Sequence, residues 1–323
     1  MIFDKFLRSK KLYMLLVLPL AMLGIWFGNY YGPGNFPVFT EREGVIPWDW
    51  WRECMPAARL GIGMGLILAE AYLLVLINAK YKFLPQRSTL PALLYVLLIL
   101  PLVLEEGAGM LLFVVLPLTL ALGGLEEAIN DTKSNGPIFN FGFFISFSVL
   151  LYPKAVLFAL WAFCVLFFSG RSTLKDVVAL FIGLLTPCLF VTFYYFWTDS
   201  LAELPKRFVN HLAEGEYLHS LQRPEWIQTG LLIFLFLLAL SHLAGYYSAS
   251  IVNQRRGVFA LLSMLFFAVV TILFIPGIQR EMVYLLAIPL SYVYSQYFIT
   301  QKRRFIGDAA FLLFITACCI GYF

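Results

Sequence analysis

The sequence predicts an all-α membrane protein, a polytopic bundle of about eleven transmembrane helices, and three observations carry that prediction. The 323 residues are 61% hydrophobic and only 13% charged, which is more apolar surface than a water-soluble domain can bury. The apolar runs are continuous and about 16 to 23 residues long, whereas a membrane barrel shows alternating strands of about ten residues. The basic residues, finally, are divided unevenly between alternate connections.

We expect one transmembrane domain, residues 1–323, with two long outer loops at 29–56 and 198–225. The predicted spans are 12–28, 57–78, 89–104, 109–125, 138–152, 154–169, 177–197, 226–248, 257–275, 282–298 and 307–323. The third to sixth are short and closely spaced, which leaves the number of crossings open by one or two.

The distribution of basic residues predicts the orientation. With the N-terminus in the cytoplasm, the inner connections hold 15 of the 23 lysines and arginines and the outer connections hold 7. This bias is the positive-inside pattern, so we expect an N-in, C-out orientation. Of the 19 acidic residues, 12 fall on the outer side. We therefore expect any functional site to open toward the outer surface.

Each outer loop contains one distinctive segment. The first loop contains "GVIPWDWWREC", residues 44–54, in which Trp48, Trp50 and Trp51 surround Asp49. Tryptophans of this kind anchor a protein at the membrane surface, or form a platform for a sugar or a lipid headgroup. In the second loop Leu204, Phe208 and Leu212 recur every four residues. That spacing predicts an amphipathic helix lying on the membrane surface.

Two isolated cations stand on the outer side, where the positive-inside bias disfavours them. Lys154 lies in the short turn "LLYPKAV", and Arg280 lies in "PGIQREMVYLLAIPL". A half-buried cation at the membrane surface needs an anionic partner, and a lipid phosphate is one candidate. Pairing with a nearby acid, such as Glu105, Glu106 or Glu281, is the alternative.

The chain contains no nucleotide-binding loop, nucleophile elbow or zinc motif. We therefore expect no cofactor, no metal and no nucleic-acid partner. Glu70 is the one carboxylate deep in a predicted span, where it would serve a transporter as a proton site or simply pack within the bundle.

Two segments together resemble the GT-C-type glycosyltransferases, polytopic enzymes that take a sugar from a polyprenyl-phosphate donor. They are residues 140–199, including "LLYPKAVLFAL", and "QREMVYLLAIPLSYVYSQYF", residues 279–298. Lys154, Arg171 and the pair Arg280 and Tyr284 fall where that family has comparable residues. The resemblance implies that Lys154 and Arg280 bind the lipid phosphate.

GT-C enzymes also carry an acidic catalytic residue early in the first outer loop, often in an Asp-Asp or Asp-Glu pair. This chain offers Glu41, Glu43 and Asp49 there, none of them in such a pair. One of the three would act as the general base on an acceptor hydroxyl. The resemblance implies a substrate groove lined by aromatic side chains, namely Trp48, Trp50, Trp51 and Tyr284.

A second resemblance extends over nearly the whole chain. The segments "INAKYKFLPQRSTLPALLYVLLI" (77–99), "LLYPKAVLFAL" (150–160) and "IGLLTPCLFVTFYYFWTDSL" (182–201) are similar to an uncharacterised family of multi-spanning inner-membrane proteins from Bacteroidota. This resemblance implies a compartment and no mechanism.

The sequence thus predicts a membrane protein that binds a polyprenyl-phosphate-linked sugar at the outer leaflet, with glycosyl transfer as its GT-C-like activity. The alternative is a non-enzymatic scaffold or accessory subunit in an envelope-assembly or secretion complex, with other proteins as partners. Whether the chain is an enzyme stays open at this point.

Overall fold

The computed structural model describes residues 13–31, 45–46, 51, 53–84, 88–106, 110–131, 133–213, 223–249, 252–275, 283–301 and 303–320. Over these ranges the regular secondary structure is entirely helical, which confirms the predicted all-α class. Each of the eleven predicted apolar spans corresponds to one α-helix, and a twelfth helix lies in the predicted second loop.

The elements follow one another as α2 (Tyr13–Tyr31), α4 (Pro56–Tyr81), α5 (Leu90–Glu106), α6 (Met110–Asn130), α7 (Gly136–Leu151), the 3-10 helix η1 (Pro153–Val156), α8 (Leu157–Phe168), α9 (Leu174–Trp197), α10 (Glu203–Ala213), α11 (Arg223–Ala249), α12 (Val252–Phe274), α13 (Val283–Thr300) and α14 (Arg304–Ile320).

Four stretches in the described part of the chain are long and apolar enough to cross a membrane. They are Pro56–Tyr81, Leu111–Asn130, Leu174–Trp197 and Val252–Phe274. Shorter apolar stretches of the described chain are Val17–Gly28, Leu90–Leu104, Gly136–Leu151, Pro153–Phe168, Ile227–Leu243 and Phe305–Ile320.

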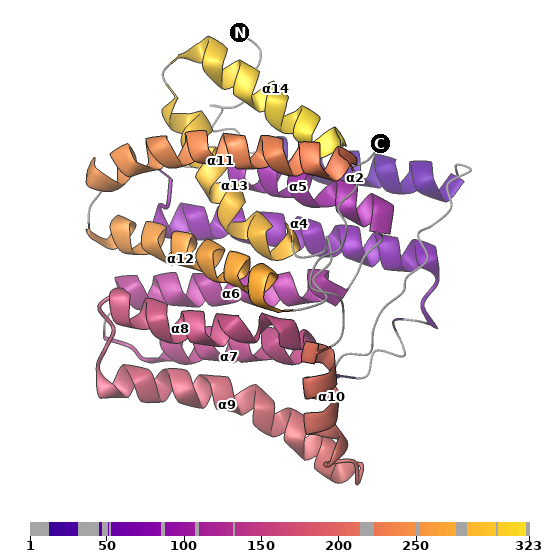
Figure 1. The fold of residues 1–323 in the computed structure, drawn as a ribbon, viewed down its shortest axis with the longest axis vertical. Coiled ribbons are helices and arrows are strands. Elements are labelled where there is room, and N and C mark those ends of the chain that lie inside the picture. The colour runs from indigo at the N-terminus through magenta and orange to yellow at the C-terminus, as the bar shows by residue number, and fades with distance from the viewer. Residues whose placement is uncertain are drawn as a thin grey trace.

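The long helices run roughly side by side, whereas α10 lies across them at one end of the bundle (Figure 1). We call this the α10 end. The opposite end, which contains the connection between α8 and α9 (residues 169–173), we call the Arg171 end. Since successive helices alternate in direction, η1 lies at the α10 end with the start of α8.

Helix α9 is fixed at its start and along one face. Thr173 and Asp176 form a reciprocal capping box that satisfies free backbone N–H groups of the first turn. Further along, α9 packs against α7 through two glycines, Gly142 and Gly183. A Cβ on Gly183 would lie 2.3 Å from the Phe139 carbonyl oxygen, and one on Gly142 would lie 2.6 Å from that of Leu180. Only glycine allows the two backbones to come this close.

Helix α13 has a different position, because it packs against α5, α6, α11 and α12. Its Tyr294 and Phe298 rings also contact Phe314 and Phe311 of α14. Its polar side chains are buried along with its apolar ones, among them Ser291, Ser295 and Gln296. Hydrogen bonds connect the helix to its neighbours. The Tyr292 hydroxyl donates to the Leu74 carbonyl of α4 at 2.6 Å, and the Tyr294 hydroxyl donates to the Leu232 carbonyl of α11 at 2.9 Å. Helix α13 is therefore a central, polar helix of the bundle.

Candidate functional site

Lys154 is buried at the α10 end, with only 2% of its surface exposed. Helix α7 ends at Leu151 with Tyr152 as its C-cap, and the tight turn η1 begins with Pro153. The turn is held by two backbone hydrogen bonds of 2.9 Å, from Tyr152 N–H to the Ser148 carbonyl and from Ala155 N–H to the Tyr152 carbonyl. Because a buried ammonium is costly, the protein around η1 must be arranged to accommodate a positive charge.

Helix α10 packs against η1 and contributes a second nitrogen base to this region. His211 is buried, and its imidazole stands perpendicular to the Tyr152 ring with the centroids 5.5 Å apart. On the same helix Arg207 pairs with Glu203 at 3.1 Å, and both side chains are substantially exposed. Helix α10 thus directs His211 into the bundle and keeps the ion pair between Arg207 and Glu203 on its exposed side.

Two residues of the predicted first outer loop are attached to the bundle. The Tyr195 hydroxyl of α9 donates a hydrogen bond of 2.5 Å to the Val45 carbonyl. Trp51 has no exposed surface, and its ring packs edge-on against Phe113 of α6 at 5.0 Å. Other predicted site residues of this loop lie outside the described residues: Glu41, Glu43, Trp48, Asp49 and Trp50. Their catalytic and substrate-binding roles stay predictions.

Tyr284, another predicted groove residue, is also buried, with 1% of its surface exposed. Its helix, α13, packs against α5, which carries Tyr95. The Tyr95 hydroxyl donates a hydrogen bond to the Glu70 carboxylate, which is fully buried. Tyr284 therefore lies on a helix next to the one that carries this buried polar pair. Arg280, predicted as the second phosphate ligand, lies outside the described residues.

A second buried carboxylate, Glu126, was not identified from the sequence. The predicted span ended at residue 125, but α6 continues to Asn130, and Glu126 is 2% exposed. The carboxylate packs against Gly257 of α12, where a Cβ would lie 2.9 Å from Glu126 Oε1. The spacing of the buried Leu122, Glu126 and Ile129 is the signal that would have revealed it, because those residues share one helix face.

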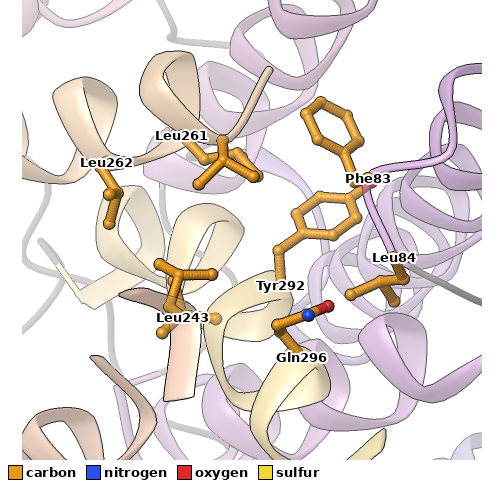
Figure 2. A pocket seen from close by; sticks show the side chains of 9 residues that line it. Phe83, Leu84, Leu243, Leu261, Leu262, Tyr292 and Gln296 are labelled. Carbon is orange, nitrogen blue, oxygen red and sulfur yellow. The ribbon is translucent and has the colours of Figure 1, made fainter. Parts of the chain in front are cut away.

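Gln296 of α13 is the polar side chain in a small, mainly apolar cavity (Figure 2). The volume of the cavity that a water centre can occupy is about 10 Å³. This is enough space for about one water molecule. Both polar atoms of the Gln296 amide are buried and make no hydrogen bond within the described structure. In Figure 2 the side chain lies close to Tyr292 and Leu84, with leucines on the opposite wall.

At the Arg171 end, Arg171 forms a structural clamp. Its guanidinium pairs with Asp176 at 3.0 Å, and both side chains are almost completely buried. It also donates to the Asp131 carbonyl at 3.2 Å and to the Ser134 carbonyl at 2.7 Å. Arg171 thereby fixes the α6–α7 connection to the start of α9.

Comparison with known proteins identifies a family. The model of a family of unknown function, DUF6427, matches residues 56–323. The chain belongs to this family. No curated protein and no solved structure matches it. The expected membership of an uncharacterised family is confirmed to that extent, whereas the similarity to GT-C enzymes and the bacterial group of origin stay predictions.

The match divides the predicted site residues of this DUF6427 protein into two groups. Lys154, Arg280 and Tyr284 lie inside the matched region. The carboxylates and tryptophans of the first predicted loop precede Pro56, the first matched residue. The DUF6427 region therefore contains the lysine that is buried at the α10 end, while the predicted general bases come from outside it.

Proposed function

We propose that this DUF6427 protein is a multi-pass protein of a bacterial inner membrane that binds the phosphate of a polyprenyl-phosphate-linked lipid at the outer leaflet. The observation that carries the proposal is the burial of Lys154 in η1, beneath α10. The proposal takes the eleven apolar helices as spans and the N-in, C-out orientation from the positive-inside pattern. The α10 end is then the outer end.

The chemistry of this end suits a phosphate. An ammonium group and an imidazole donate hydrogen bonds that a phosphate oxygen accepts, and such charge-assisted bonds are strong away from water. Helix α10 has the sequence of a surface helix, with Val209 exposed and His211 facing the bundle. An amphipathic helix lying in the interface stands at the depth of lipid headgroups. Lys154 and His211 would therefore meet the lipid at its phosphate.

The enzymatic form of the proposal adds one step. A carboxylate, Glu41, Glu43 or Asp49, removes the proton from an acceptor hydroxyl, whose oxygen then attacks the anomeric carbon of the lipid-linked sugar. The bond from that carbon to the phosphate oxygen breaks, and the polyprenyl phosphate leaves with the negative charge that Lys154 neutralises. The structure describes the lysine, and the carboxylates lie outside the described residues.

Lipid binding by purified protein tests the proposal. We expect Lys154→Met, which keeps the length of the side chain and removes its charge, to weaken binding of a polyprenyl phosphate about tenfold or more, since a hydrogen bond to a charged group is worth about 1.5–3 kcal/mol. Native mass spectrometry with a short-chain polyprenyl phosphate measures the affinity. Lys175→Met is the matched control, because Lys175 is exposed at the Arg171 end.

The thermal unfolding midpoint of each variant, measured without lipid, separates binding from folding. A Lys154→Met protein that unfolds like the unsubstituted protein and binds the lipid equally well contradicts the proposal. If Lys154→Met unfolds early, His211→Gln serves as the second variant and is expected to weaken binding as well.

The scaffold remains a second candidate because of one observation on α9. This helix presents an apolar side with Phe190, Phe193 and Trp197 all more than half exposed. A hollow in this side is lined by Phe190, Phe193, Phe196 and Leu201. A partner helix would cover such a surface, although lipid chains also would.

A photo-crosslinking residue at Phe190 distinguishes a protein partner from lipid. The control position is Phe274 of α12, which is 72% exposed. A discrete protein adduct at position 190 alone supports the scaffold. Lipid adducts at both positions contradict it.

A further inference from the structure

A groove lies on the side of the bundle near the Arg171 end. It is apolar in its deeper part and charged next to the helix ends, as a phospholipid is apolar along its acyl chains and charged at its headgroup. The groove is formed by α4, α6 and α7 and has a volume of about 250 Å³. Leu73, Leu76 and Leu120 line its deeper part. Lys80 and Glu127 line the part next to the helix ends.

Glycines open the floor of this groove. Gly123 and Gly124 are consecutive residues of α6 and both line it. A Cβ on Gly124 would lie 3.2 Å from the Pro137 carbonyl oxygen, so the glycine allows α7 to approach α6 closely. A Cβ on Gly123 would lie 3.6 Å from Ile77 and would take up space between α4 and α6. The absence of both side chains leaves a depression between three helices.

A charged ligand can replace the ion pair at the edge of the groove. Lys80 Nζ lies 3.4 Å from Glu127 Oε1, with the two side chains 61% and 48% exposed. The Lys80 ammonium also lies 5.0 Å from the centre of the Tyr81 ring. An exposed ion pair of this kind contributes about 0–1 kcal/mol, so a ligand that offers an anion and a cation replaces it at little cost.

The depth of these residues matches a lipid. Lys80 is in the last turn of α4 and Glu127 in the last turn of α6, while Leu73 and Leu120 lie about two turns deeper. In a bilayer that arrangement puts the charges at the headgroups and the leucines among the acyl chains.

We propose that this groove binds an aminophospholipid of the inner leaflet, a lipid whose headgroup carries a phosphate and a primary ammonium. The phosphate pairs with Lys80 and the ammonium with Glu127, while part of an acyl chain occupies the space over Gly123. An anionic lipid without an amine leaves Glu127 facing a second negative group, which is unfavourable. The proposal rests on the helices crossing a membrane in the N-in, C-out orientation of the proposed function, and it is independent of the lipid phosphate at the α10 end.

Native mass spectrometry of the full-length protein tests the groove, with phosphatidylethanolamine and phosphatidylglycerol of identical acyl chains as the probes. We expect one phosphatidylethanolamine to bind about fivefold more tightly than phosphatidylglycerol, because charge-assisted hydrogen bonds contribute only part of their full value at an exposed site. Glu127→Gln should remove that preference by weakening phosphatidylethanolamine alone. Lys80→Gln should weaken both lipids.

The controls are Lys175→Gln, an exposed cation at the same end, and Glu203→Gln, an exposed acid at the α10 end. Both should keep the preference. Equal affinity of the unsubstituted protein for the two lipids overturns the proposal, and so does a preference that survives in Glu127→Gln. Because Lys80 and Glu127 are exposed, neither variant removes a buried contact, and loss of lipid-phosphate binding by Lys154→Met would leave the result at the groove unchanged.

Discussion

Among the single residues of the bundle, Gln296 has an environment that works against stability. Its amide is 2% exposed, and neither polar atom makes a hydrogen bond within the described structure. Burial of an unsatisfied amide costs about 1–3 kcal/mol. Glu70, by contrast, receives a hydrogen bond from Tyr95 at one carboxylate oxygen, while its other oxygen, Oε1, has no hydrogen-bond partner within the described structure. The cost of burying Glu70 is therefore offset in part, whereas the cost of burying the Gln296 amide is not.

We expect Gln296→Met to raise the free energy of unfolding by about 1 kcal/mol, since methionine keeps the volume and removes the unsatisfied groups. The thermal unfolding midpoint of purified protein measures this, with Gln228→Met, at a partly exposed position of α11, as the control. A lower midpoint in Gln296→Met would mean that the amide has a partner in solution, such as a bound ligand.

On the scale of helices, α9 depends on its glycine contact with α7. The same contact places the Ser146 Oγ of α7 3.4 Å from the Cys188 Sγ of α9. We expect Ser146→Cys to form a disulfide with Cys188 under mild oxidation, and we expect Gly183→Val to abolish it by forcing the two backbones apart. Mass spectrometry after thiol alkylation counts the free thiols. Gly230→Val, where the added Cβ meets no atom within 4 Å, should leave the disulfide intact; its loss there as well would contradict the role of Gly183.

The elements were more predictable from the sequence than the directions of their side chains. Apolar runs predicted the long helices, and the spacing of Leu204, Phe208 and Leu212 predicted α10. The end of α6 was misplaced because a carboxylate facing lipid is costly. Glu126 faces Gly257 of α12 instead. Whether a side chain faces lipid or a neighbouring helix depends on contacts between distant segments, which one sequence does not contain.

The same limit applies to the candidate site. The sequence identified Lys154 as an unusual cation, but its burial under α10 depends on a helix about fifty residues further along. The composition of the "PWDWW" segment indicated a membrane interface, yet Trp51 is completely buried against Phe113. The sequence of this tryptophan-rich segment does not indicate which indole ring faces the bundle.

For the whole molecule, the decisive prediction concerns orientation. In a variant without the natural cysteines we expect Lys206→Cys in α10 to react with a membrane-impermeant maleimide from the outer side. Lys133→Cys, in the α6–α7 connection, should react only after the membrane is broken. Both positions are exposed in the structure. The reverse labelling pattern would mean that the protein has the opposite orientation, with the α10 end facing the cytoplasm.

The central position of α13 has a consequence for how the chain is made. Helices α5 and α6, which it contacts, leave the ribosome far earlier than α13, the penultimate helix. Those helices cannot complete their packing during most of synthesis, because the segment that fills the space between them does not yet exist. Truncation before Val283 should therefore leave an inserted but incompletely assembled intermediate, a natural substrate for membrane quality-control proteases.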